Sequence, residues 1–331
     1  TNSERRISHV RKAILAPGEA RPDWAITVDF AQRLEKRLRP QHPSLFAFDR
    51  PSQLFDEFKL LTRGRDLDLC GISHALIDQI GPQQWPFPAG ARQGTARLYS
   101  DGIFPTANGR AQFIAEPYRA AKEQRDARFP LTLITGRLRD QWHGMSRTGT
   151  AAQLFGHVSE AVLSLHPDEL RRHRLQPGDL VNLKSRRGAV IVAVGSDDSV
   201  RPGQAFLPMH WGDRFLKGGV NSVTLPAFDP LSKQPELKHS GVRLESVNLP
   251  WQLFALIEGD VQRHFETLRP LCEAFSYVSL SLVGRERPAL LIRAASVAAP
   301  DPQLLGEIDE CLSLIDGPVL AYDDPRRAIG K

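Results

Sequence analysis

The spacing of hydrophobic residues predicts that the first third of the chain is helical and then extended. Helical spacing recurs in three stretches, at 23–38, 52–64 and 73–81. The first suits an amphipathic helix from Val28 onward, and the second is expected to begin with Ser52 as its N-cap and to close at Gly64. Residues 81–113 are rich in proline and glycine and predict a long ordered arm, with a turn at 107–109.

Residues 130–248 change to a pattern typical of β-structure. Short apolar runs bounded by turn residues predict strands at 130–135, at 160–165, on both sides of a turn at 185–188, and within 200–211. One short helix is expected over 166–175, where proline suits the first turn. Several short strands with one small helix, and no repeating β–α–β unit, favour a closed barrel over a doubly wound sheet.

The last region, from residue 250, predicts a small α/β domain. Helices are expected at Leu253–Phe265 and Pro302–Leu314, with strands at 277–283 and 289–296 between them. The final stretch shows no obvious terminator, and the chain opens on Thr1 rather than on methionine. We therefore expect further sequence on both sides of these 331 residues.

A charged connector, 118–129, precedes an expected domain boundary at Pro130. Its run KEQRDAR is interpreted as a solvated linker face. The expected organisation is a partial α/β region over 1–129, a β-barrel domain over 130–248 and a small α/β domain over 250–331.

Composition excludes several classes of protein. No run approaches the roughly 20 apolar residues of a membrane helix. The net charge of +5 comes from basic residues interleaved with acidic ones, without the basic stripe of a nucleic-acid-binding surface. The three cysteines lie far apart, which argues against a zinc or iron–sulfur site within this chain and is compatible with the cytoplasm.

Three separated stretches carry residues suited to one large ligand. They are 135–144, 208–215 and 219–238, and each follows or lies beside an expected strand. A polyphosphorylated heterocycle needs cations and backbone N–H groups for its phosphates, amides for a base edge, and flat rings against the heterocycle. The candidates are Arg137 and Lys238 as cations, Asn221 and Gln141 as amides, and Trp142 and Trp211 as rings.

Several of these stretches also carry a family resemblance. The motifs TGRLRDQWHGMSRTG, NSVTLPAFDPLSKQPELK and TNSERRI resemble the molybdopterin oxidoreductases of the dimethyl-sulfoxide-reductase superfamily. Within it, GEARPDWAI, LTRGRDLDLCG and GPQQWPFP are similar to the C-terminal part of assimilatory nitrate reductase catalytic subunits. The resemblance extends over essentially the whole chain, including YDDPRRAIGK near its end.

The resemblance implies a fold, a cofactor and a reaction. The barrel would be a double-psi β-barrel, preceded by the remainder of the catalytic domain, and would close over Mo-bis(molybdopterin guanine dinucleotide) to reduce nitrate to nitrite in nitrate assimilation. His210 is the alternative to Trp211 at one contact. The implied cofactor-binding residues are Thr135, Gly136, Arg137, Leu138, Gln141, Trp142, His143, Gly144, Ser146, Arg147, Trp211, Asn221 and Lys238.

The resemblance also implies that essential parts lie outside this chain. The cysteines for a [4Fe–4S] cluster and the cysteine that ligates molybdenum lie upstream in the family, so we expect no catalytic or metal-ligating residue here. The chain alone is expected to be inactive and to need the N-terminal catalytic domains. A ferredoxin, a flavodoxin or an NADH-dependent reductase remains open as the electron donor.

Alternatives remain open at this level. Another family member such as a formate dehydrogenase would share these motifs, and a non-catalytic β-barrel module could bind a nucleotide or a protein partner instead. His143 could donate a hydrogen bond to the cofactor or a proton near an oxyanion. In the cofactor reading, Arg137, Gln141, Trp142, Asn221 and Lys238 should border one concave polar surface at one end of the barrel.

Overall fold

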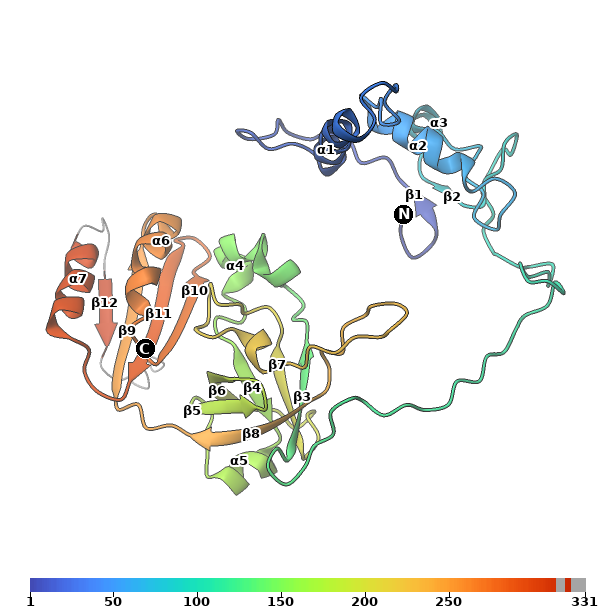
Figure 1. Ribbon diagram of the computed structural model, residues 1–331. Helices are drawn as coiled ribbons and strands as arrows, with labels where there is room; N and C mark the ends of the chain where they lie inside the picture. The colour runs from blue at the N-terminus through green and yellow to red at the C-terminus, as the bar shows by residue number, and fades with distance from the viewer. Residues whose placement is uncertain (314–318, 323–331) are drawn as a thin grey trace. The chain divides into compact units, whose positions relative to one another are not determined.

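The computed structural model describes residues 1–313 and 319–322, and it divides the chain into two compact units, Thr1–Pro117 and Tyr118–Lys331 (Figure 1). Leu314, at the end of one expected helix, and most of the motif YDDPRRAIGK lie outside the described residues. Within the described part, no helix combines the length and hydropathy needed to cross a membrane.

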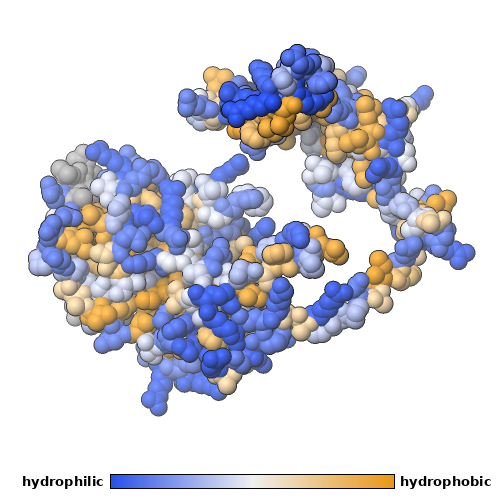
Figure 2. All heavy atoms as spheres, in the orientation of Figure 1, coloured by the Kyte–Doolittle hydropathy of each residue, from blue (hydrophilic) through white to orange (hydrophobic). Residues whose placement is uncertain are grey.

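The first unit has little core. Its helices are α1 (Asp23–Leu38), α2 (Pro51–Leu60) and α3 (His74–Ile80), and the short strands β1 (Arg6–Ile7) and β2 (Gln83–Gln84) pair antiparallel. Its buried cluster consists of Leu69, Ile72, Ile77 and Phe87. Along α1 Val28 is buried, whereas Ile26, Phe30, Leu34 and Leu38 are exposed. Figure 2 shows hydrophobic side chains on the surface of this unit.

Two helix boundaries in this unit differ from the sequence prediction. The amphipathic helix begins at Asp23 rather than near Val28. The second helix begins at Pro51, with Arg50 rather than Ser52 at the N-cap, because proline fits the first helical position and Gln53 reaches back to the Arg50 N–H. The third helix is confirmed, since Ser73 accepts the Leu76 N–H and Gly81 follows with φ of 83°.

The second unit begins with the expected barrel. The barrel strands are β3 (Leu131–Gly136), β4 (Val162–Leu165), β5 (Leu180–Ser185), β6 (Ala189–Ser196), β7 (Gln204–Pro208) and β8 (Ser240–Ser246). Among the described residues they close in the order β3-β7-β4-β6-β5-β8, with β3 parallel to β7 and β4 parallel to β6. The helix α5 (Pro167–His173) lies between β4 and β5, as the sequence predicts. The mixed α/β fold class with a closed barrel is therefore confirmed.

A four-stranded sheet with two helices follows the barrel. It contains β9 (Trp251–Glu258), α6 (Val261–Cys272), β10 (Tyr277–Val283), β11 (Ala289–Ser296), α7 (Pro302–Ser313) and β12 (Val319–Tyr322). The described strands run antiparallel in the order β10-β11-β9-β12, the arrangement of a ferredoxin-like β–α–β–β–α–β unit.

The expected helix Leu253–Phe265 is wrong. Residues 251–258 form the strand β9, which pairs with β11 on one side and β12 on the other. The helix starts only at Val261, after Gly259 with φ of 116° and Asp260, whose side chain caps it by accepting the Arg263 N–H. The strands at 277–283 and 289–296 are confirmed.

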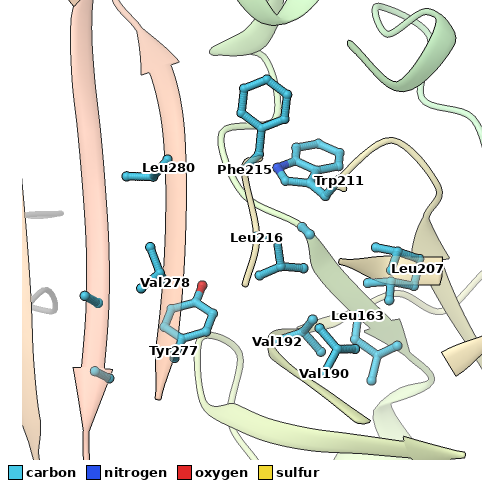
Figure 3. Close-up of a cluster of buried hydrophobic side chains, with 14 of the residues drawn as sticks. Leu163, Val190, Val192, Leu207, Trp211, Phe215, Leu216, Tyr277, Val278 and Leu280 are labelled. Atoms are coloured by element: carbon cyan, nitrogen blue, oxygen red, sulfur yellow. The ribbon is translucent and has the colours of Figure 1, made fainter. Parts of the chain in front are cut away.

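One hydrophobic core joins the barrel to this sheet. Barrel residues such as Leu163 and Leu207 belong to the same buried cluster as Val278 and Leu280 of β10 (Figure 3). The barrel segment around Leu216 also hydrogen-bonds along the edge of β10, with the Leu280 N–H donating to the Phe215 carbonyl over 2.8 Å. The sheet is therefore held to the barrel by both backbone pairing and apolar packing.

Candidate functional site

The candidate site lies where two parallel barrel strands end. Because β3 and β7 run parallel, Gly136 and Pro208 sit at the same end of the barrel. Gly136 has no space for a side chain, since a Cβ there would lie 2.6 Å from the Phe206 ring. Its carbonyl accepts the Met209 N–H over 2.9 Å, which ties the two strand ends together.

The loop after β3 presents a cation and an open ring. Arg137 is exposed, and its guanidinium lies 5.8 Å from the centroid of the Trp142 ring. Trp142 is 52% exposed, and His143 stands edge-on to it with the ring centroids 4.8 Å apart. A tryptophan this accessible is available to cover a flat ligand, as the sequence predicts.

The backbone beside that ring is strained. His143, Gly144 and Met145 have successive φ values of 44°, 62° and 62°, in the left-handed region that side chains disfavour. Met145 is buried beneath them, while Ser146 and Arg147 are exposed on the turn. Glycine adopts this conformation freely, but at His143 and Met145 it costs about 1–3 kcal/mol per residue, and such strain concentrates at binding and catalytic sites.

Two polar residues of this loop are committed to internal contacts. Gln141 is buried, and its amide donates to the Leu154 carbonyl and accepts from the Thr148 hydroxyl. The Asp140 carboxylate is hydrogen-bonded to Arg139 and to His157. These two contacts, of which the one to Arg139 has the larger effect, lower the pKa of its carboxyl to about 2. Gln141 thus positions the loop, and its amide does not face a ligand in this structure.

After β7, the structure separates two neighbouring aromatic residues. Trp211 is fully buried against Phe155, with 6.1 Å between the ring centroids, and its Nε1 has no hydrogen-bond partner. The expectation that Trp211 forms a flat surface for a ligand therefore does not fit its burial. His210 instead contacts the loop after β3, where its Nε2 accepts the Leu138 N–H over 3.0 Å.

The third stretch reaches the same end of the barrel. The Thr135 hydroxyl donates to the Leu237 carbonyl over 2.7 Å, and the Lys238 Nζ donates to the Thr135 carbonyl over 2.8 Å. Asn221 is exposed in the short helix η3 (Val220–Val223), whose first N–H donates to the Trp211 carbonyl. The three stretches of backbone therefore converge at one end of the barrel, as expected.

A groove of about 750 Å³ opens beside Asn221. Its lining consists of Arg187, Asn221, Ser222 and Thr224, which we call the first wall, and of residues 225–228, Lys233, Pro235 and Leu237, which we call the second wall. Its lining is mainly apolar, so the expected polar surface is wrong in character. Arg137, Gln141, Trp142 and Lys238 lie outside this lining.

A hairpin-like arm extends the second wall. Residues 227–236 fold back on themselves, with the Glu236 N–H donating to the Ala227 carbonyl and the Asp229 N–H to the Gln234 carbonyl. Phe228 and Leu231 are exposed on this arm, which projects from the barrel between η3 and β8 (Figures 1 and 2). The apolar letters in VTLPAFDPL were the available sequence signal for this surface.

His210 supplies a testable feature of this site. Burial lowers the pKa of His210, and the nearby Arg137 lowers it further. With the folded pKa below the ordinary 6.5, the unfolded chain takes up the proton first as the pH falls. The stability contributed by neutral His210 is thus fully present above pH 6.5, and it is lost as the pH falls from 6.5 through the lower pKa of the folded protein.

We expect His210→Gln, whose amide oxygen can accept the Leu138 N–H, to lose less stability on acidification from about pH 7.5 to about pH 5.5 than the wild type. His210→Leu should cost about 1–3 kcal/mol at the higher pH, because that N–H loses its acceptor. Urea denaturation at the two pH values measures both effects. If the wild type and His210→Gln lost the same stability on acidification, protonation of His210 would not be a cause of that loss.

Comparisons with known proteins identify the family of the barrel domain. Residues 131–241 match the model of the Molydopterin dinucleotide binding domain, which covers the barrel strands β3–β7 and the start of β8. The nitrate reductase of Klebsiella oxytoca is 34% identical over 261 residues, which cover 76% of this chain and 29% of that protein. The nitrate reductase of Synechocystis is 36% identical over 262 residues, which cover 75% and 34%.

A formate dehydrogenase is also similar. The F420-dependent formate dehydrogenase subunit alpha of Methanocaldococcus jannaschii is 30% identical over 247 residues, which cover 75% of this chain and 34% of that protein. The chain thus spans about a third of the length of these curated relatives. It contains a molybdopterin dinucleotide-binding domain and belongs to the molybdopterin oxidoreductases.

Proposed function

We propose that this chain is the C-terminal, cofactor-binding part of a molybdenum-dependent nitrate reductase that acts in nitrate assimilation in the cytoplasm. The observation that carries the proposal is the convergence of 135–147, 208–211 and 219–238 at one end of the barrel. The similarity to nitrate reductases supports the choice of nitrate as substrate. The similarity to a formate dehydrogenase keeps that enzyme as the second candidate.

The residues at this end of the barrel fit a molybdopterin dinucleotide. Arg137 and Arg147 are exposed and, within the described residues, form no ion pair, so their charges are available to phosphates. Trp142 offers an open ring, and the Asn221 amide stands at the edge of the groove for a base edge. Lys238 holds the Thr135 carbonyl and thereby fixes the strand end beneath the ligand.

In this proposal the protein supplies placement and charge. The bound cofactor, Mo-bis(molybdopterin guanine dinucleotide), would supply the redox chemistry that converts nitrate to nitrite. The residues of this chain would bind the phosphates, cover the heterocycle and exclude water. His143, beside the exposed ring, would donate a hydrogen bond to the cofactor.

The remaining parts of the enzyme belong to the same proposal. The [4Fe–4S] cluster and the molybdenum ligand would come from N-terminal domains, and a ferredoxin, a flavodoxin or an NADH-dependent reductase would donate electrons. Among the described residues no group of three or more His, Cys, Asp or Glu side chains could hold a metal. Because the cluster and the molybdenum ligand would lie in the N-terminal domains, the 331 residues alone should produce no nitrite.

Arg137→Ala in the full-length enzyme tests the proposed site. Loss of one charged hydrogen bond to a phosphate should weaken cofactor binding by about 1.5–3 kcal/mol, so molybdenum per polypeptide should fall. The apparent KM for nitrate of the metal-containing enzyme should change little, because the lost contact would be to a phosphate of the cofactor and not to the substrate. Metal analysis and steady-state kinetics measure the two quantities.

Arg139→Ala is the matched control. Arg139 lies two positions along the same loop and is 83% exposed, but it is paired with Asp140 rather than free. Its molybdenum content should stay at the wild-type level. Equal metal contents in both variants and the wild type would remove Arg137 from the site.

A further inference from the structure

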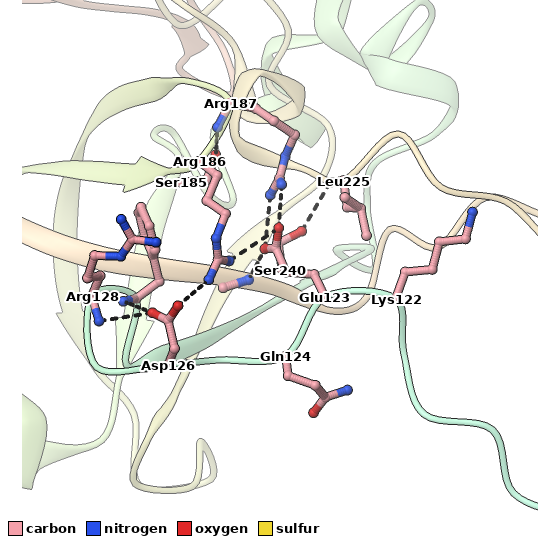
Figure 4. Close-up of polar contacts among 12 residues, drawn as sticks. Lys122, Glu123, Gln124, Asp126, Arg128, Ser185, Arg186, Arg187, Leu225 and Ser240 are labelled. Atoms are coloured by element: carbon pink, nitrogen blue, oxygen red, sulfur yellow. Dashed lines mark hydrogen bonds and ion pairs between the residues drawn. The ribbon is translucent and has the colours of Figure 1, made fainter.

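The connector that enters the barrel domain is anchored beside the groove. The Glu123 side chain is only 10% exposed, and its carboxylate accepts hydrogen bonds from the Arg187 guanidinium and from the Gly241 N–H (Figure 4). Arg186 lies 3.4 Å from the same carboxylate. The earlier interpretation of the run KEQRDAR as a solvated face is therefore wrong at Glu123, which is partnered by residues about 60 and 120 positions away in the chain.

Arg187 links Glu123 to the first wall of the groove. Its Nε donates to the Thr224 carbonyl over 2.9 Å, and one Nη donates to the Val223 carbonyl over 3.3 Å. Both carbonyls lie at the C-terminal end of η3, the helix that presents Asn221. The planar guanidinium therefore fixes the end of η3 while its other edge is held by Glu123.

The neighbouring residue, Lys122, contacts the base of the arm that carries part of the second wall. The Lys122 N–H donates to the Glu236 carboxylate over 3.1 Å. The Glu236 N–H in turn closes the base of the arm by donating to the Ala227 carbonyl over 2.8 Å. Of two consecutive connector residues, Glu123 thus contacts Arg187 in the first wall, and Lys122 contacts Glu236, which lies between Pro235 and Leu237 of the second wall.

We infer that Glu123 is a positioning residue for the dinucleotide site, which it shapes by holding Arg187 against the end of η3. The inference rests on the proposed function and adds a residue outside the matched domain of 131–241. The carboxylate is charged at neutral pH: burial raises the pKa of Glu123, but the hydrogen bonds from Arg187 and Gly241 outweigh it and the net direction is downward. Without that charge, two arginines face each other and Arg187 is free to leave the carbonyls of 223 and 224.

Glu123→Gln in the full-length holoenzyme tests the inference, because glutamine keeps the size of the side chain and an acceptor for the Gly241 N–H. We expect the bound nucleotide to leave the enzyme at least about tenfold faster than from the wild type, as for the loss of one charged hydrogen bond. The rate is measured as nucleotide appearing in solution, at a fixed interval below each protein's Tm. Arg187→Gln, which cuts the same link on the groove side, should release nucleotide at a similar rate, and the double variant should be no faster.

Asp126→Asn is the matched control. Asp126 lies on the same connector and binds Arg186 and the N–H groups of Arg128 and Phe129, but none of the groove walls. It should release nucleotide within about twofold of the wild type, whatever its effect on Tm. Equal release from Glu123→Gln and Asp126→Asn would overturn the positioning role, whereas a wild-type enzyme that held no dinucleotide would overturn the proposed function itself.

Discussion

Replacing Trp211 with alanine is expected to lower the free energy of unfolding of the barrel by about 3–5 kcal/mol. The side chain is fully buried and packs on Phe155 beside Leu216 and Phe215 (Figure 3). Its Nε1 has no hydrogen-bond partner, so the substitution removes packing and leaves a cavity without breaking a polar contact. Urea denaturation followed by far-ultraviolet circular dichroism measures the change.

Trp142→Ala is the matched control at the same end of the barrel. With half of its side chain exposed and with Arg137 and His143 beside its ring, Trp142 should contribute no more than about 0.5 kcal/mol to folding. In the full-length enzyme the same substitution should reduce the cofactor content. A Trp142 variant as unstable as the Trp211 variant would show that the exposed ring is structural and would contradict its assignment to a ligand.

These two tryptophans show how far residue type alone predicts a site. The motif around Trp142 placed an aromatic ring after β3, and the structure leaves that ring open. The motif around Trp211 predicted a second ring open to a ligand. In the structure the adjacent His210 contacts the loop after β3, and Trp211 is buried in the core. A shift of one position reverses the side of the chain that a residue presents, and sequence spacing does not fix it at a strand end.

The fold was predictable where the hydrophobic pattern has one explanation. Strands β10 and β11 match the expected ranges, because their short apolar runs end in turn residues. The helix predicted from Leu253 was wrong because residues 251–258 form β9, which lies between β11 and β12 in the sheet. Its nearly continuous apolar run resembles that of a buried helix. Gly259-Asp260 was the signal that separated this strand from the helix after it.

The sequence could not predict which distant residues form hydrogen bonds with a given polar side chain. Glu123 looked solvated because its neighbours in the chain are charged, yet its partners come from the β5–β6 turn and from β8. The amide of Gln141 looked available for a base edge and is occupied by Leu154 and Thr148. In both cases the residue type was read correctly as polar, and only the fold determines which polar group it meets.

The second large effect is expected at the junction between the barrel and the C-terminal sheet. Glu160, just before β4, accepts hydrogen bonds from Tyr277 and from Arg293, and the Arg293 guanidinium also donates to the Gly178 carbonyl over 3.0 Å. Both charged side chains are mostly buried, and the Arg293 Nε has no partner. Burial raises the pKa of Glu160, and Arg293 opposes this shift by its charge and its hydrogen bond.

Glu160→Leu should therefore cost about 3 kcal/mol or more, because an arginine cannot lose its charge and would remain buried without a counter-ion. Arg293→Leu should cost less, because the buried carboxyl can take up a proton instead. A carboxyl whose folded pKa is raised binds more protons in the folded state, so the stability of Arg293→Leu relative to the wild type should recover as the pH falls from about 7 toward about 5. Urea denaturation of both variants across this pH range measures the asymmetry.

Arg287→Leu, in the turn between β10 and β11, serves as the control. Arg287 is 81% exposed and lies 4.0 Å from Glu258, so its loss should change the free energy of unfolding by no more than about 0.5 kcal/mol at any pH in the range. Equal costs for Glu160→Leu and Arg293→Leu, with no dependence on pH, would contradict the assigned difference between an unpaired buried arginine and an unpaired buried carboxyl. At neutral pH the loss in the free energy of unfolding should therefore be largest for Glu160→Leu, smaller for Arg293→Leu and smallest for Arg287→Leu. As the pH falls, the loss should shrink for Arg293→Leu alone.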